Sequence, residues 1–172
     1  MRSHSLLCTL FVLFSLPALA LAGPRFSASS SKSSEKADFG PDKVFDGLLH
    51  TSWAEDAPGL GIGEWIEIDL GADVSIQTLT IWGGAFGGKE DWKGRGRAAE
   101  LTVTGKTAAG AAALEQTVSL GDRYARKEVE VETTVRTLRF TLDDVHEGAI
   151  FADTHIAEIA FDFAEKADPS WQ

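Results

Sequence analysis

The chain has 172 residues, a formal net charge of −10 at neutral pH, and a single cysteine, Cys8. This length suits one domain with a sizeable apolar core and is short for two. The acidic balance argues against a general affinity for nucleic acid or anionic lipid, because both repel a negatively charged surface.

The N-terminus has the order of a secretory signal peptide. Arg2 precedes an apolar run over residues 6–21, and small side chains follow at Ala20, Ala22 and Gly23. This order of charge, apolar stretch and small residues is typical of a cleaved export signal. We expect cleavage after Ala22 and export to the medium, a periplasm or the cell surface.

Cleavage would remove residues 1–22 and with them Cys8. The mature chain would then carry 15 basic and 26 acidic residues, a formal charge of −11, and no thiol. Disulfides, thiolate zinc sites, iron–sulfur clusters and cysteine nucleophiles are excluded from such a chain. We also expect no transmembrane segment in the mature chain.

Alternation of apolar and polar residues, the mark of a half-buried strand, recurs along the chain. It follows a serine-rich lead-in at 23–34, which is either a flexible spacer or a first edge strand. Residues 107–113 are rich in Ala and Gly and form either a hairpin loop or a helical turn, and residues 164–172 are expected to be a flexible tail. The alternating segments are Ile66–Leu70, Leu79–Ile81, Leu101–Val103, Val118–Leu120, Val129–Val131, Leu138–Leu142 and Ala157–Phe163. About eight short strands without a long helical segment predict an all-β antiparallel sandwich or barrel.

A glycine-rich segment, WGGAFGGKEDWKGRGR at 82–97, combines aromatic and basic side chains. With so many glycines, the segment offers little apolar surface to bury an indole, and an exposed ring here would be a ligand platform. An exposed ring stacks on the apolar face of a sugar, while arginine and lysine bond the sugar's hydroxyls. The alternative is an ion pair for Arg97 and a solvated loop for residues 89–93. The candidate ligand-binding residues here are Trp82, Phe86, Lys89, Trp92, Arg95 and Arg97.

Two motif groups carry a resemblance to a known family. The first joins an F-D-G turn at 45–47, a T-x-W at 51–53 and the strand GEWIEIDLG at 63–71; the second is DDVHEGAIFADTHIAEIAFDF at 143–163. Together they resemble discoidin-like domains, also called coagulation-factor type C domains. The likeness covers residues 26–163 and is greatest to a bacterial branch of NADase-type glycan-binding domains, which includes the non-catalytic translocation module of a secreted NAD glycohydrolase.

The resemblance implies a jelly-roll β-sandwich of the galactose-binding type with a structural calcium ion near the F-D-G turn. Calcium takes six to eight oxygen ligands from carboxylates, hydroxyls and carbonyls. The alternative is that Asp46 caps a turn and Glu158 is solvated. The resemblance also implies that Trp53 and Trp65 are core residues. If the 143–163 loop lies on the same rim as the glycine-rich segment, His146 and Phe151 would extend the ligand-binding face. The implied calcium ligands are the side chains of Asp46, Thr51 and Glu158 and the carbonyls of Lys43, Leu48 and Ala157.

The sequence contains no recognisable catalytic constellation. His50, His146 and His155 lack the H-x-x-x-H spacing and a G-x-S-x-G partner. Glu67 and Asp69 are explained as the polar face of a strand. We therefore expect a non-catalytic binding module that recognises a glycan; the alternative is an adhesion or assembly protein that binds a protein or a lipid head group through the same loops.

Overall fold

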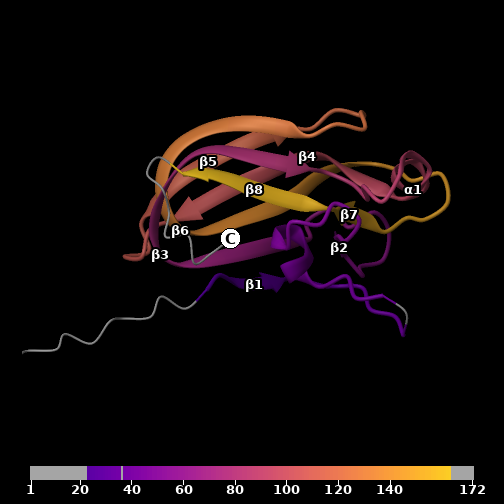
Figure 1. Cartoon of the computed structure of the whole chain (residues 1–172), viewed down its shortest axis with the longest axis horizontal. Coiled ribbons are helices and arrows are strands. Elements are labelled where there is room, and N and C mark those ends of the chain that lie inside the picture. The colour runs from indigo at the N-terminus through magenta and orange to yellow at the C-terminus, as the bar shows by residue number, and fades with distance from the viewer. Residues whose placement is uncertain (1–22, 36, 164–172) are drawn as a thin grey trace, which may run out of the picture.

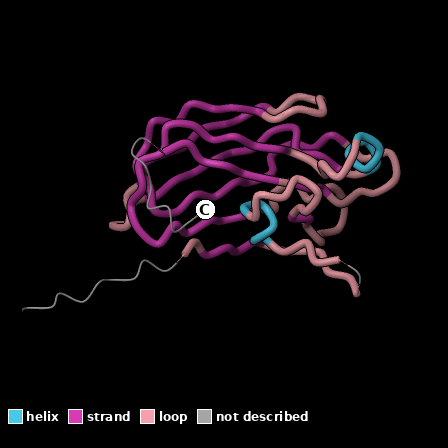
Figure 2. Tube along the Cα trace, viewed as in Figure 1, coloured by secondary structure: helices cyan, strands magenta, loops and turns pink. Residues whose placement is uncertain are grey.

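The computed structural model describes residues 23–35 and 37–163. The predicted signal peptide and C-terminal tail lie outside these residues. Strands make up most of the described chain, and its helices are short (Figure 2). The elements are, in chain order, β1 (Arg25–Ala28), the 3-10 helix η1 (Pro41–Phe45), β2 (Trp53–Ala54), β3 (Trp65–Trp82), α1 (Lys89–Gly94), β4 (Gly96–Lys106), β5 (Ala112–Ser119), β6 (Lys127–His146), β7 (Thr154–Ile156) and β8 (Glu158–Phe163).

The described strands form one curled, eight-stranded sheet in the order β1-β3-β6-β4-β7-β2, with β5 beside β4 and β8 beside β3. Pairing is antiparallel except between β4 and β7, which run parallel. The sheet closes around a single core, and α1 lies at one end of the molecule (Figure 1). This architecture is the predicted β-sandwich, with one parallel pairing added.

Two long strands build both layers of the sandwich. The first part of β3 pairs with β1 and with the second part of β6, whereas its last part pairs with β8 and with the first part of β6. Register shifts between Asp69 and Val74 and between Ile76 and Thr78 bend the pair. Extra residues of this kind break the ladder and increase its twist. The sequence therefore showed separate alternating segments where the chain forms two continuous strands.

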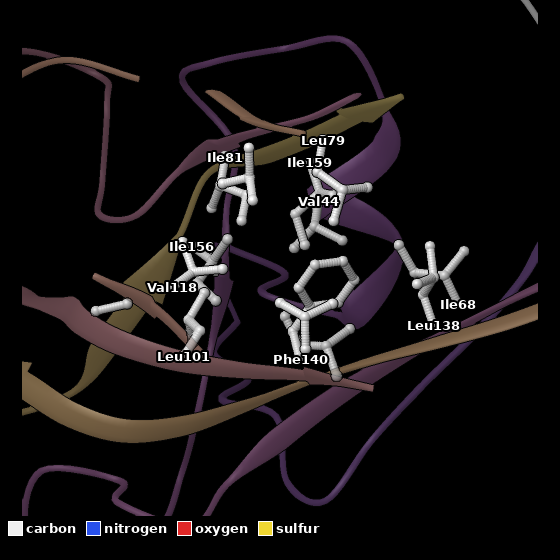
Figure 3. Close-up of a cluster of buried hydrophobic side chains, with 14 of the residues drawn as sticks. Val44, Ile68, Leu79, Ile81, Leu101, Val118, Leu138, Phe140, Ile156 and Ile159 are labelled. Atoms are coloured by element: carbon white, nitrogen blue, oxygen red, sulfur yellow. The ribbon is translucent and has the colours of Figure 1, made fainter. Parts of the chain in front are cut away.

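The alternation correctly identified the core. Ile66, Ile68 and Leu70 on β3 are fully buried, and so are Leu138 and Phe140 on β6. Side chains from both layers and from η1 interdigitate in this cluster (Figure 3). Burying a side chain of this size stabilises a fold by roughly 1.5–3 kcal/mol, so this cluster dominates the stability of the molecule.

One of the two tryptophans assigned to the core lies elsewhere. Trp53 is fully buried, as expected. Trp65 is only half-buried, and the guanidinium carbon of Arg139 lies 3.9 Å from the centre of its ring. Its neighbour Ile66 faces the core, so the alternation of β3 places Trp65 on the outer face. The core assignment of Trp65 is therefore wrong.

The structure decides two alternatives that the sequence left open. Residues 107–111 form a hairpin turn between β4 and β5, in which the Thr107 amide donates to the Ala111 carbonyl at 2.9 Å. The start of the serine-rich segment belongs to β1, an edge strand on β3. Beyond β1, Ser29 and Ser30 both donate to Glu64. Neither helix of the described part has the length and apolar character that a bilayer crossing requires.

Candidate functional site

Trp92, a predicted ligand platform, is buried. Only 8% of the residue is exposed, and its ring lies against the backbone of Gly84. A Cβ atom at Gly84 would approach the indole to 2.7 Å, so glycine at this position makes room for the ring. The glycines that suggested an empty neighbourhood instead allow close packing. The expectation that Trp92 is exposed is wrong.

Arg97 is also buried, against the ring of Trp92. Its guanidinium lies 4.5 Å from the centre of the Trp92 ring and donates from Nε to Asp122 at 3.0 Å. A second nitrogen, Nη1, donates to the carbonyls of Trp92 and Arg95. Arg97 thus forms an ion pair, as in the alternative interpretation. Its contacts join residues 92–95 to the segment that contains Asp122.

A stacked aromatic pair, of which Tyr124 is the exposed member, contacts Trp92 of α1. Phe86 stacks on Tyr124 with ring centres 4.7 Å apart and planes 18° from parallel. Tyr124 is 37% exposed, and its hydroxyl donates to the Phe86 carbonyl. The edge of Trp92 supports the same ring from 5.9 Å. Sequence patterns do not identify Tyr124, because the segment before β6 has no alternation and its partner Phe86 is 38 residues away.

The half-buried Arg95, just after α1, contacts the exposed ring of Phe151. The guanidinium of Arg95 lies 5.0 Å from the centre of the Phe151 ring, and its Nε donates to Asp91 at 2.8 Å. Phe151 is 46% exposed. The amides of Ile150 and Phe151 both donate to the carbonyl of Gly94, which fixes this loop on the end of α1. This loop therefore contacts the end of the glycine-rich segment, which is the condition for Phe151 to extend the ligand-binding face.

The remaining predicted ligand residues have different environments. Lys89 is exposed at the start of α1, and Trp82 is half-buried at the end of β3. His146 is half-buried opposite Arg97 in the ladder. The indole nitrogen of Trp92 and Nε2 of His146 are buried without a hydrogen-bond partner in the described chain.

A buried polar chain lies behind Arg95. His155 is fully buried; its Nδ1 lies 2.8 Å from Ser52 Oγ, and its Nε2 lies 2.8 Å from Asp153 Oδ2. Lys32 donates to the same carboxylate at 2.8 Å. Burial lowers the pKa of His155, and the hydrogen bond from His155, followed by that from Lys32, lowers the pKa of Asp153. The network therefore joins a neutral imidazole to an ionised carboxylate.

The order of Ser52, His155 and Asp153 has the composition of a hydrolytic triad but not its arrangement. In a triad the serine contacts Nε2 and the carboxylate contacts Nδ1, whereas the two nitrogens are exchanged here. Ser52 is only 5% exposed. A nucleophile must reach a substrate carbonyl, so this geometry favours a structural role that fastens β2 to β7.

Acidic and hydroxyl oxygens converge where η1 meets β8. Thr51 Oγ1 lies 2.9 Å from each carboxylate oxygen of Asp46 and 2.7 Å from the Leu48 carbonyl. Glu158 reaches this turn, because its Oε2 accepts from the Gly47 amide at 3.2 Å. The structure thus brings together four of the residues predicted near the ion, from positions more than one hundred apart.

Glu158 is 7% exposed, which excludes the alternative that it is simply solvated. Burial, and secondly the negative charge of Asp46, raise the pKa of Glu158 to about 7. The negative charge of Asp46 disfavours ionisation of Glu158, and a bound cation would relieve this repulsion. Within residues 23–35 and 37–163, no three His, Cys, Asp or Glu side chains gather, so an ion here would need hydroxyl and carbonyl ligands, which calcium accepts.

Of the three predicted carbonyl ligands, Leu48 is in this turn, Lys43 lies in η1 just before it, and Ala157 directly precedes Glu158. The side chain of Lys43 forms ion pairs with Asp38 and Asp42, so only the backbone carbonyl of this η1 residue could be a ligand of the ion. Ala157 is buried between β7 and β8, next to Glu158. The donor set therefore fits a hard divalent cation.

Comparison with known proteins places this geometry in a family. Residues 24–162 match the family described as the NAD glycohydrolase translocation F5/8 type C domain. The chain belongs to this family. No curated protein sequence matches the chain.

Solved structures share the fold of this F5/8 type C domain. One is the family 32 carbohydrate-binding module of Clostridium perfringens NanJ in complex with galactose, with 16% identity, a TM-score of 0.62, and coverage of 80% of this chain and 92% of that one. Another is the family 32 module of AlyQ in complex with 4,5-unsaturated mannuronic acid, with 20% identity, a TM-score of 0.56, and coverage of 81% and 95%.

A third is chitosan-binding module 1 of a chitosanase/glucanase from Paenibacillus sp. IK-5, with 17% identity, a TM-score of 0.59, and coverage of 82% and 95%. At these identities the likeness shows the fold of this F5/8 type C domain, which is that of carbohydrate-binding modules.

Proposed function

We propose that the protein is an exported, non-catalytic module that binds a glycan across the surface around α1. The observation that carries the proposal is the presence of two exposed aromatic rings, Tyr124 and Phe151, each held by a neighbour that fixes its orientation. Phe86 stacks on the first, and the Arg95 guanidinium lies over the second.

Rigid aromatic rings suit sugars, because a pyranose presents apolar C–H groups on its faces and hydroxyls at its rim. Pre-positioned rings lose little conformational entropy when a ligand binds. Arg95 and Lys89 supply donors for the rim hydroxyls, while Trp92 and Arg97 support the surface from beneath. The complexes of similar folds with galactose and with an unsaturated mannuronic acid support the same class of ligand.

The non-catalytic part of the proposal rests on the buried network. Ser52 and His155 are almost completely enclosed, and the imidazole nitrogens are exchanged relative to a hydrolytic triad. Export is supported by the order of charge, apolar stretch and small residues at 1–23, and by membership of a translocation domain family.

A calcium ion is part of the proposal. Asp46, Thr51 and Glu158 would hold it with their side chains, and Lys43, Leu48 and Ala157 with their carbonyls. A divalent cation there would neutralise the two facing carboxylates and join the turn after η1 to β8. Its role would be structural, because these residues are not among those that form the aromatic surface.

The test is a glycan-array screen of the mature protein with calcium and with a chelator, followed by calorimetric titration of the best ligand. Tyr124→Ala and Phe151→Ala should each weaken binding at least tenfold with little change in the melting temperature, since both rings are partly exposed. Ile62→Ala is the matched control, because Ile62 is 60% exposed and lies outside the proposed surface.

An array without a ligand would overturn the glycan proposal. Capture of a protein or of lipid vesicles that depends on Tyr124 and Phe151 would then favour the adhesion alternative. The exposed side chain of Ile150 beside Phe151 is the feature that such a partner would contact.

A further inference from the structure

The outer face of the sheet carries a pocket distant from the surface at α1. It has a volume of about 120 Å³ and lies over the three central strands. Thr104 is seven residues along β4 from Arg97, which places the pocket roughly 20 Å from the end with α1 at the usual rise per residue. The lining residues are Glu67 of β3, Thr104 and Lys106 of β4, and Thr137 and Arg139 of β6.

Strand register explains why these side chains meet. Glu67, Arg139 and Thr104 lie side by side across β3, β6 and β4. Lys106 pairs with Thr137 in the next outward-facing row. Side chains that alternate outward on neighbouring strands form such rows, because the sheet is in register. The pocket is thus a built feature of the ladder and does not depend on a loop.

Arg139 is fixed in the pocket from two sides. Its guanidinium stacks on Trp65 at 3.9 Å and donates from Nε and Nη2 to Glu67 at 3.0 and 2.9 Å. A guanidinium has five N–H donors, so the Nη1 edge stays available. Its side chain is 40% exposed, which leaves that edge accessible to a ligand.

Three further polar groups of the pocket have no partner in the described chain. Lys106 is exposed and forms no ion pair there, and the hydroxyls of Thr104 and Thr137 form no hydrogen bond. The carboxylates nearest in register are Glu67, which is paired with Arg139, and Glu115, which lies across from Thr104. The pocket therefore offers a free ammonium and a partly free guanidinium to an anion.

We propose that this pocket is a second binding site, which takes the carboxylate or sulfate of an acidic saccharide between Lys106 and Arg139. The threonine hydroxyls would bond neighbouring hydroxyls of the same sugar. The pocket is smaller than the 300–1,000 Å³ usual for a whole small-molecule ligand, so it admits one charged substituent and part of a ring.

The experiment is an NMR titration of the ¹⁵N-labelled mature protein with three probes. A hyaluronan oligosaccharide carries carboxylates, a sulfated dextran oligosaccharide carries sulfates, and a neutral dextran oligosaccharide carries neither. We expect saturable amide shifts at residues 104, 106, 137 and 139 with one or both charged probes and none with the neutral one. The arm that responds identifies the anionic group.

Lys106→Gln should weaken this binding at least tenfold, since a hydrogen bond to a charged group contributes about 1.5–3 kcal/mol. Lys127→Gln removes an equal charge from an exposed position at the start of β6 and should leave it unchanged. Tyr124→Ala should also leave it unchanged, which separates this site from the surface at α1. Absent shifts at these four residues, or an equal loss in the Lys127 variant, would overturn the proposal.

Discussion

Arg95 and Arg97 are two residues apart in one basic cluster, yet they have different roles. Arg97 points inward at the start of β4, where Trp92 and Asp122 enclose its charge. Arg95 precedes the strand and lies against the exposed ring of Phe151. Composition could identify the cluster as basic, but only the position at which β4 begins determines which arginine is buried.

Replacement of Trp92 tests how much its packing against Gly84 and Arg97 contributes to stability. Trp92→Ala should destabilise the protein by about 3 kcal/mol, because removing a buried tryptophan leaves a cavity beside Gly84 and Arg97. Urea unfolding measures the loss, and Lys89→Ala on the same helix should stay within about 0.5 kcal/mol of the parent. An unchanged unfolding midpoint for the Trp92 variant would show that the indole is not part of the core.

The two misassigned tryptophans show the limit of prediction from single residues. Trp65 was assigned to the core from its motif, and Trp92 to the surface from its glycine neighbours. The alternation of β3 places Ile66 inward and thus Trp65 outward, a signal that was present in the sequence. The burial of Trp92 depends on Gly84 and Arg97, whose positions relative to it come from tertiary structure.

At the scale of elements, the bend shared by β3 and β6 contains both register shifts and a residue with a left-handed backbone conformation. Glu132 has φ of +39°, the one non-glycine positive value in the described chain, and it lies beside the register shift. Alternation predicted strands on both sides of this region. It could not predict that they are continuous, because the residues of a bulge do not follow the period of two.

Glu132→Gly should relieve this backbone strain. A non-glycine residue in the left-handed region costs roughly 1–2 kcal/mol, which offsets or exceeds the 0.5–1 kcal/mol that glycine costs in a strand. Glu130→Gly, on the same strand without a positive φ, should lose that amount without compensation. In chemical denaturation, we expect the unfolding free energy of Glu132→Gly to be about 1 kcal/mol higher than that of Glu130→Gly. Equal unfolding free energies would contradict the presence of strain at Glu132.

The ion pair between Arg136 and Asp69 predicts that the stability of the protein depends on pH. The hydrogen bond from Arg136 is the main cause that lowers the pKa of Asp69 to about 2, from 3.8. On acidification the unfolded chain therefore takes up a proton before the folded one. The stability from this pair is complete above about pH 4 and is lost as the pH falls towards 2.

Arg136→Gln should flatten the fall in unfolding free energy between about pH 4 and 2. Because both side chains are partly exposed, solvent screening keeps the effect small. Arg126→Gln disrupts a more exposed pair with Glu128 and serves as the control. If the two variants follow the same pH curve as the parent, the Asp69 pair does not contribute.

For the whole molecule, the proposed calcium ion would connect early and late parts of the chain. The resemblance implied that Asp46 and Glu158 meet, and the structure places both at the turn after η1. Composition could not predict this contact, because Glu158, which accepts a hydrogen bond from the Gly47 amide, is 111 positions further along the chain.

Calcium removal tests this connection. A ligand at one hundred times its Kd stabilises the folded state by about 2.7 kcal/mol. At about 2–4 °C per kcal/mol for a chain of this size, a chelator should lower the melting temperature by about 5–10 °C. Asp46→Asn should abolish the response, whereas Asp56→Asn in the next loop should retain it; a parent protein insensitive to chelator would exclude the ion.

The described chain begins and ends beside the same bend. Arg25 of β1 lies opposite Asp69, and Phe163 of β8 lies opposite Ile76, seven residues further along β3. Figure 1 shows both ends on the side away from α1. A fusion partner joined beyond either β1 or β8 would therefore lie at the opposite end of the sandwich from the aromatic surface and would leave that surface accessible.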